Sequence, residues 1–252
     1  MFSVDDVERT GEYGHLPVLL REVLDYLNPQ PGGLFVDGTL GAGGHASAIM
    51  DRTAPDGHLL GFDRDPQALQ FAAQRLASYG DRFVPVVASY ADMGTIAPGH
   101  DISAVDGILL DLGLSSRQLE DANRGFSFLK EGPLDMRFDP TTGPSAVELL
   151  ATLDEAELAD VIWRYGDERR SRAIARAIVA RRETEPVHTT RQLAELVAHI
   201  VGHQSGRGHP ATRTFQALRI AVNKELEQLE QVLANSAPIL VEGGRLVVIS
   251  FH

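Results

Sequence analysis

A glycine-rich stretch between a short strand and a helix constrains this chain more than any other part of its sequence. Residues 34–37 have the apolar character of a buried strand, and a helical pattern with small and apolar side chains covers residues 46–50. The loop between them is made of small residues, and its glycines are Gly38, Gly41, Gly43 and Gly44. Glycine permits positive φ and close approach of a ligand, and a following helix presents free N–H groups and the positive end of its dipole. The stretch predicts a loop that binds the polar part of a nucleotide-like ligand.

The spacing of the glycines leaves two such ligands open. Gly41, Gly43 and Ala46 match the G-x-G-x-x-G/A spacing of dinucleotide sites. Asp63 lies 20 residues after Gly43, at the end of the next strand-like run, where a ribose-binding acid belongs. A nicotinamide dinucleotide is therefore one interpretation. The loop is longer than the tight turn around a pyrophosphate, and the first strand ends in its own acid, Asp37, which favours S-adenosylmethionine, a ligand without phosphates.

Strand-like runs and helical segments alternate over the first 111 residues. The runs cover residues 34–37, 58–63, 83–87 and 106–111, and the last is apolar enough to be buried on both faces. This alternation predicts an α/β fold with a parallel, doubly wound sheet that binds its ligand at the carboxyl ends of the strands. Polar side chains stand at those ends: Asp37, Asp63, Ser89 with Tyr90, and Asp111. We expect one crevice to collect them.

The alternation breaks after Asp111. A long loop over residues 117–143 is followed by three helical segments, two of which begin with capping boxes, Asp154-x-x-Glu157 and Thr189-x-x-Gln192. One long amphipathic helix from Ala211 then returns to the sheet. We predict a cofactor-binding domain made of residues 1–123 and 211–252, with an inserted helical lobe for substrate recognition over residues 124–210.

Both ends of the chain carry an expectation. A helix is predicted from His15, with Pro17 in its first turn. Residues 243–251 predict a fifth strand, which would leave an apolar strand at or near a sheet edge, an arrangement that natural proteins avoid. We therefore expect a C-terminal part to follow residue 252.

Composition excludes several classes of function. The chain has no cysteine, which excludes disulfides, thiolate metal sites and the zinc-dependent deaminases. A polar, acidic N-terminus and the lack of a membrane-length apolar run predict a cytoplasmic protein with no membrane partner. The net charge is −12, yet residues 117–224 hold 16 Lys and Arg against 15 Asp and Glu. Nucleic-acid binding depends on local potential, so an RNA partner stays possible.

Seven stretches resemble the bacterial methyltransferases that modify N4 of a cytidine in the decoding region of small-subunit (16S) ribosomal RNA. They are HLPVLLREVLDYL, FVDGTLGAGGH, GFDRDPQAL, DGILLDLGLSS, GFSFLKEGPLDMR, HPATRTFQALRIAVNKELEQLE and GGRLVVISFH. They cover nearly the whole chain, and DGTLGAGGH, DLGLSS and HPATRTFQALRI together are highly specific. The resemblance implies a class I, Rossmann-like methyltransferase sheet with an inserted helical lobe, S-adenosylmethionine as cofactor, no metal, and 16S rRNA or the small ribosomal subunit as partner. Members of that family continue beyond the final SFH.

The same resemblance assigns cofactor-binding residues by matching motif. They are Gly43, Gly44, His45, Asp63, Tyr90, Asp111 and Gln118. The first three would line the methionine part, and Asp63 would take the ribose hydroxyls. Three of them have a plainer alternative: Asp63 could cap the following helix, although Asp65 is better placed for that, His45 could be an ordinary helix-start residue, and Tyr90 could pack in the core.

Methylation of an exocyclic amine requires help because the N4 lone pair of cytosine is delocalised into the ring. A group that accepts hydrogen bonds from the amino protons localises that pair, and in-line placement against the sulfonium supplies the remainder by proximity. Asp111, with Ser115 and Ser116 just beyond it, is the predicted catalytic region. The two serines could instead cap a helix or a turn.

Arginines on the predicted loops are the expected RNA contacts: Arg124, Arg137, Arg207 and Arg213. The run from Arg164 to Arg182 is interleaved with acids, and a solvated helix face explains it as well as RNA binding does. Two other functions stay open, a Rossmann-type dehydrogenase and a non-catalytic RNA-binding relative or assembly factor. Retention of Asp63 and Asp111 argues against the second.

Overall fold

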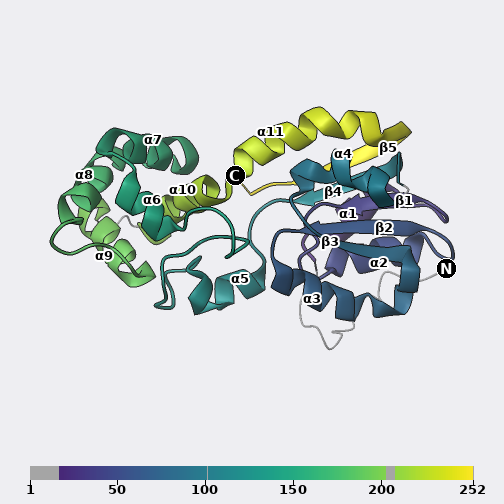
Figure 1. Cartoon of the computed structure of the whole chain (residues 1–252), viewed down its shortest axis with the longest axis horizontal. Helices are drawn as coiled ribbons and strands as arrows, with labels where there is room; N and C mark the ends of the chain where they lie inside the picture. The colour runs from purple at the N-terminus through teal and green to yellow at the C-terminus, as the bar shows by residue number, and fades with distance from the viewer. Residues whose placement is uncertain (1–16, 101, 203–207, 252) are drawn as a thin grey trace. The chain divides into compact units, whose positions relative to one another are not determined.

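The structure is a computed structural model that describes residues 17–100, 102–202 and 208–251 (Figure 1). The chain forms two compact units, which we name the sheet unit (Met1–Gly113 with Gln231–His252) and the helical unit (Leu114–Glu230). The helical unit is thus wider than the lobe predicted over residues 124–210. That residues 124–210 recognise the substrate stays a prediction.

The sheet unit is built on five parallel strands. They are β1 (Leu34–Asp37), β2 (His58–Asp63), β3 (Phe83–Val87), β4 (Val105–Asp111) and β5 (Leu240–Ile249), in the order β3-β2-β1-β4-β5. The predicted parallel, doubly wound α/β fold is confirmed. The chain order reverses between β1 and β4, and crevices at such a switch point are where open sheets bind ligands. Asp37 on β1 lies opposite Gly61 of β2 and Leu109 of β4, so the carboxyl ends of these three strands are neighbours.

One core joins a face of the sheet to three helices, α1 (Leu20–Leu27), α2 (Gly44–Arg52) and α3 (Pro66–Arg75). Val23 and Leu27 of α1, Ile49 and Met50 of α2, and Leu69 and Ala72 of α3 are buried against Phe35, Leu59 and Phe83. Asp65 caps α3 by accepting a hydrogen bond from the Gln67 N–H at 3.0 Å, with Pro66 in the first turn.

The start of α1 differs from the prediction. The helix begins at Leu20 because Leu19 adopts a left-handed conformation with φ of 51°, and the exposed side chains of Val18 and Leu19 offer no apolar stripe there. His15 lies outside the described residues.

Short helical segments connect β3 to β4 and flank the other elements. They are η2 (Ala77–Arg82), η3 (Tyr90–Asp92), α4 (Met93–Ile96), η4 (Ala97–His100) and η6 (Ala237–Ile239). After α3, the chain continues directly into η2, in which Gly80 has a φ of 58°.

The helical unit has its own apolar core. Its elements are α5 (Ser116–Glu120), η5 (Ala122–Arg124), α6 (Ala146–Thr152), α7 (Glu155–Gly166), α8 (Ser171–Arg181), α9 (Thr190–Val201), α10 (Thr212–Asn223) and the start of α11 (Glu225–Ser236). Both predicted capping boxes are present, at Asp154 and Thr189. A third, Ser145 with Glu148, begins α6, a helix that the sequence analysis did not predict although its signal was there.

The single long helix predicted from Ala211 is wrong, because Lys224 adopts φ of 52° and separates α10 from α11. The Asn223 side chain holds this break: its Nδ2 donates to the Met136 carbonyl at 2.7 Å and its Oδ1 accepts from the Phe138 N–H at 2.8 Å. A bidentate ion pair between Arg219 and Glu225 spans it. Amphipathic periodicity continues through Lys224, so the pattern alone does not show the break.

Candidate active site

The glycine loop after β1 is fixed to both neighbouring strands. The Gly38 N–H donates to the Leu109 carbonyl of β4 at 2.8 Å, and the Leu40 N–H donates to the Phe62 carbonyl of β2 at 2.9 Å. Gly43, at φ of 75°, ends the loop and caps α2. Gly44 follows, and a Cβ there would stand 2.9 Å from Cγ of Pro17, so the loop passes under the segment that leads into α1. The predicted strand, glycine turn and helix are confirmed.

Both carboxylate oxygens of Asp63 accept hydrogen bonds from the main chain. Its Oδ2 accepts from the Gly41 N–H at 2.8 Å, and its Oδ1 accepts from the Asp65 N–H at 2.8 Å. Burial raises its pKa to about 6, against the effect of these backbone hydrogen bonds. The Arg64 N–H is a third backbone donor to this carboxylate. An ionised carboxylate has about four acceptor positions, so acceptor capacity stays open for a hydroxyl group. Because Asp65 caps α3, the helix-cap alternative for Asp63 is excluded.

Asp37 and Thr39 connect the ends of β1 and β4, a role that the sequence analysis missed. Asp37 is buried, and its Oδ1 accepts from the Thr39 N–H at 3.0 Å. The Thr39 hydroxyl in turn accepts from the Asp111 N–H at 2.6 Å. Burial, together with the nearby Asp63 and Asp111, raises the pKa of Asp37 to about 7, although the Thr39 hydrogen bond acts in the opposite direction. The sequence indicates that Asp37 is an acid at the end of a strand, but its burial is evident only from the tertiary structure.

Asp111 stands at the end of β4 with a carboxylate that is open to a ligand. Its side chain is 29% exposed, and among the described residues it accepts no hydrogen bond. Burial raises its pKa, while His45 acts in the opposite direction. The His45 Nδ1 lies 4.0 Å from Asp111 Oδ2, beyond hydrogen-bond distance. The Asp111 carboxylate therefore keeps both of its oxygens available to accept hydrogen bonds from a bound amine.

His45 is a buried side chain that fastens the segment before α1 to α2. Its Nε2 lies 2.8 Å from the Val18 carbonyl, so this nitrogen carries the proton and donates to Val18. Burial lowers the pKa of His45, which keeps the ring neutral, with Nδ1 as an acceptor facing Asp111. Contact with the methionine part of a cofactor stays a prediction for this residue, as it does for Gly43 and Gly44.

Tyr90 begins η3 directly beside the glycine loop. A Cβ on Gly38 would stand 2.8 Å from Cβ of Tyr90, so the absence of a side chain at Gly38 lets the two segments meet. Tyr90 is half-buried, which is consistent with both predicted roles, core packing and contact with a ring at the strand ends.

Ser115 and Gln118 form the capping box of α5 in the helical unit. The Gln118 N–H donates to Ser115 Oγ at 3.2 Å, and the Ser115 N–H donates to Gln118 Oε1 at 3.1 Å. The helix-cap alternative therefore accounts for Ser115, and Gln118 is buried. Ser116 is exposed. Catalytic roles for the two serines and cofactor binding by Gln118 stay predictions.

Three of the four arginines predicted to contact RNA form hydrogen bonds within the helical unit. Arg124 is buried and donates from Nη2 to the carbonyls of Arg137 and Phe138 at 3.0 and 2.8 Å. Arg137 pairs with both carboxylate oxygens of Asp135, which raises the pKa of the guanidinium. Arg213 donates to the Asp167 carbonyl at 2.9 Å. Arg207 lies outside the described residues. The structure therefore gives Arg124 a role in holding the loop, which sequence position could not show.

A parallel sheet of this order, with a glycine loop after β1 and an acid at the end of β2, defines a nucleoside-cofactor domain of the class I methyltransferase type. The chain belongs to the MraW methylase family, whose model matches residues 12–252. The cofactor of this protein is S-adenosylmethionine.

Similar proteins cover most of the chain. The Ribosomal RNA small subunit methyltransferase H of Geotalea uraniireducens is 52% identical over 244 residues, which are 96% of this chain and 78% of that protein. The proteins of the same name from Geobacter sulfurreducens and Syntrophobacter fumaroxidans are each 51% identical, over 95% and 94% of this chain and 78% and 75% of their own lengths.

The residues at the strand ends fit this cofactor. S-adenosylmethionine carries a sulfonium and an ammonium against one carboxylate, and the site offers three acids on β1, β2 and β4, with Asp63 and Asp111 each repelling a charge on Asp37. A bound cation relieves that repulsion. No group of His, Asp and Glu among the described residues has the arrangement of a metal site. The open acceptor positions of Asp63 suit ribose hydroxyls, which are neutral donors.

The buried Asp37 predicts that the free protein becomes less stable as pH rises. Its pKa of about 7 in the folded chain exceeds the ordinary 3.8, so between these values the native state binds more protons than the unfolded state. The free energy of unfolding therefore falls as pH rises from 4 through 7, for this residue by an amount on the order of 2–4 kcal/mol. Asp37→Asn should remove most of this loss when urea unfolding is compared at pH 5 and pH 8.

Asp25→Asn is the matched control, because Asp25 lies exposed on α1 beside Arg21. It should keep the pH dependence of the wild type. An Asp37→Asn protein that loses as much stability as the wild type between the two pH values would show that Asp37 is not protonated in the folded chain.

Proposed function

We propose that this protein transfers the methyl group of S-adenosylmethionine to N4 of a cytidine in the decoding region of 16S rRNA. The observation that carries the chemistry is the open carboxylate of Asp111 at the switch point, next to the cofactor acids on β1 and β2. The substrate is supported by family membership and by the names of the relatives, which are ribosomal RNA small subunit methyltransferases. No helix among the described residues is long and apolar enough to cross a membrane. We place the protein in the cytoplasm, where its RNA partner or the small ribosomal subunit would be.

The chain's own residues supply position and charge. Bound S-adenosylmethionine provides an electrophilic methyl group on a sulfonium. Asp63 holds the ribose end through its open acceptor positions, and the glycine loop leaves the main chain accessible beside it. Asp111 accepts hydrogen bonds from the amino protons of the cytosine, which localises the N4 lone pair toward the methyl group. The Thr39 hydroxyl fixes the Asp111 main chain, so the carboxylate is positioned before the substrate arrives.

Nucleoside preference separates this proposal from the dehydrogenase alternative. We expect S-adenosylhomocysteine to raise the melting temperature of the protein, because it presents the same ribose to Asp63, and we expect NAD to leave it unchanged. A single-turnover assay with S-adenosylmethionine labelled in the methyl group then tests transfer to 16S rRNA. Stabilisation by NAD would favour the dehydrogenase, and cofactor binding without any transfer would favour a non-catalytic relative.

A further inference from the structure

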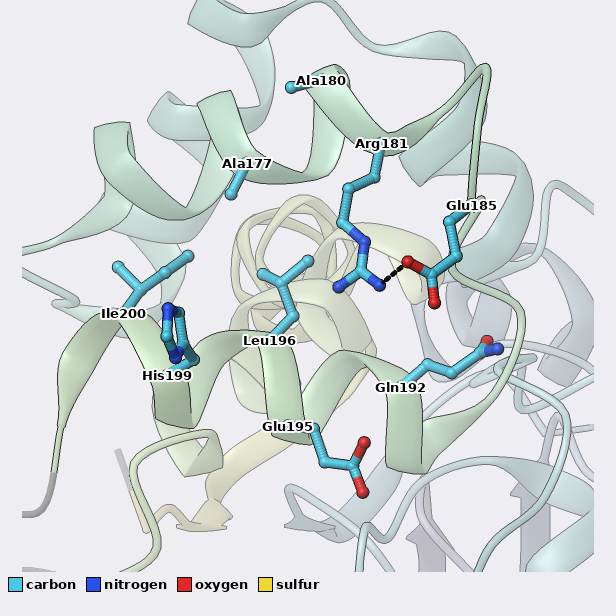
Figure 2. Close-up of a pocket in the computed structure, with 9 residues that line it drawn as sticks. All are labelled: Ala177, Ala180, Arg181, Glu185, Gln192, Glu195, Leu196, His199 and Ile200. Atoms are coloured by element: carbon cyan, nitrogen blue, oxygen red, sulfur yellow. Dashed lines mark ion pairs between the residues drawn. The ribbon is translucent and has the colours of Figure 1, made fainter.

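The helical unit carries two cavities with different linings. The first, about 430 Å³, lies between α8 and α9 and is shown in Figure 2. Figure 2 shows the ion pair between Arg181 and Glu185 on one side and the apolar side chains of Leu196 and Ile200 within the groove, with Glu195 on the facing helix. Its only arginine already has an acidic partner, and a second acid stands nearby. This lining does not favour a phosphate.

The second cavity, about 990 Å³, lies between α7 and the start of α8. It is lined by a tryptophan, three arginines, two acids and small residues: Trp163, Arg169, Arg170, Arg172, Glu155, Asp160, Ala156, Ala159, Ser171 and Ala173. Trp163 is the one tryptophan of the chain and is 50% exposed, whereas Ile162 and Gly166 beside it on α7 are buried. An indole face is therefore accessible on an otherwise well-packed helix.

The charges around this cavity leave an excess of positive charge. The two lining acids are already paired with arginines outside the lining: Glu155 with Arg176 at 3.3 Å and Asp160 with Arg164 at 3.4 Å. Arg170 donates to the Ile200 carbonyl at 2.9 Å. In the part of the chain that the structure describes, Arg169 and Arg172 are exposed and have no ion-pair partner. Two free guanidinium groups thus flank an exposed aromatic ring.

We propose that this surface, the Trp163 surface, docks a single-stranded segment of the RNA substrate. Bases of unpaired RNA stack on aromatic side chains, and arginines bind the flanking phosphates. Trp163 supplies the stacking face, and Arg169 and Arg172 supply the phosphate contacts. The inference rests on the proposed function, because it takes RNA as the substrate. It assigns docking to Arg169, in the turn between α7 and α8, and to Arg172 on α8, in place of Arg124. The exposed indole beside these arginines favours RNA over an acidic polypeptide as occupant, because a nucleotide offers a base that stacks on the ring as well as a phosphate.

The lone tryptophan makes the test direct. A short unstructured oligocytidylate should quench the protein fluorescence with a saturable, salt-sensitive titration. Trp163→Ala should weaken binding of the same RNA, followed by anisotropy of a labelled strand, by about tenfold, whereas Trp163→Phe should bind within about threefold of the wild type. Arg169→Gln with Arg172→Gln should lower the slope of log Kd against log salt concentration by about 1.4, as expected for two phosphate contacts on a single strand.

The matched control is Arg181→Gln with Arg191→Gln, which removes a half-buried and an exposed arginine that are paired with Glu185 and Glu131. It should keep the affinity and the salt slope. Thermal unfolding by circular dichroism verifies that each variant folds. Wild-type affinity in Trp163→Ala and in the Arg169, Arg172 double variant would overturn the proposal, as would quenching by polyglutamate and not by RNA. If those variants still methylate 16S rRNA, the proposed function is unaffected and only the docking surface is wrong. If the wild-type protein binds the RNA at this surface without transferring methyl, only the proposed function is wrong.

Discussion

Asp111→Ala is expected to lower the rate of methyl transfer at saturating cofactor by about 100-fold or more. The side chain is the open acceptor at the switch point, and loss of a positioned acceptor or donor for a reacting group has effects of this order. Single-turnover transfer to 16S rRNA measures the rate. Asp111→Asn keeps one acceptor oxygen without the charge and should lie between the wild type and alanine.

Stability distinguishes this role from a structural one. Burial raises the pKa of Asp111, and its carboxylate has no hydrogen-bond donor among the described residues, so the ionised group costs stability above that pKa. Its main-chain bond to Thr39 is kept in the variant. We therefore expect Asp111→Ala to unfold at an equal or higher urea concentration than the wild type at pH 8. A variant that unfolds readily and keeps its rate would mark Asp111 as a structural residue.

Asp63→Ala is expected to weaken binding of S-adenosylmethionine by about tenfold or more in calorimetry. One charged hydrogen bond contributes roughly 1.5–3 kcal/mol, and the variant loses at least one such bond to the ribose. It also leaves the N–H groups of Gly41 and Asp65 without their acceptor, which loosens the glycine loop. Both effects act in the same direction on cofactor affinity.

Asp65→Ala separates ribose binding from the local fold. Asp65 caps α3 through the Gln67 N–H, so its removal should cost about 1 kcal/mol of stability and leave cofactor affinity nearly unchanged. Equal cofactor affinities in wild type and Asp63→Ala would show that the ribose is held elsewhere.

Local signals in the sequence predicted the strands of the sheet unit and several helix starts of the helical unit. β2 and β3 have the predicted bounds because short apolar runs ended by polar residues are typical of buried parallel strands. Capping pairs such as Asp154 with Glu157 placed the helix starts. Asp63 and Asp111 were predicted to lie at one sheet edge because parallel strands bring their carboxyl ends together.

Contacts between distant segments could not be predicted in this way. The break at Lys224 depends on Asn223 reaching Met136 and Phe138, which are more than 80 residues away. The burial of Arg124 depends on two carbonyls that follow it in a loop without periodicity. The hydrogen bond from His45 to Val18 also joins two segments that are distant in sequence, and no local pattern predicts their contact. Roles assigned to such side chains from sequence alone need a structure.

We propose that the strand-end acids of this MraW-family methylase direct a methyl group to the exocyclic amine of cytosine. The most direct test is mass analysis of nucleosides from 16S rRNA treated with wild-type protein and S-adenosylmethionine, with Asp111→Ala as the comparison. We expect N4-methylcytidine in the wild-type sample and its near absence with Asp111→Ala. A methyl group found only on carbon 5 of cytosine or on a ribose oxygen would contradict it.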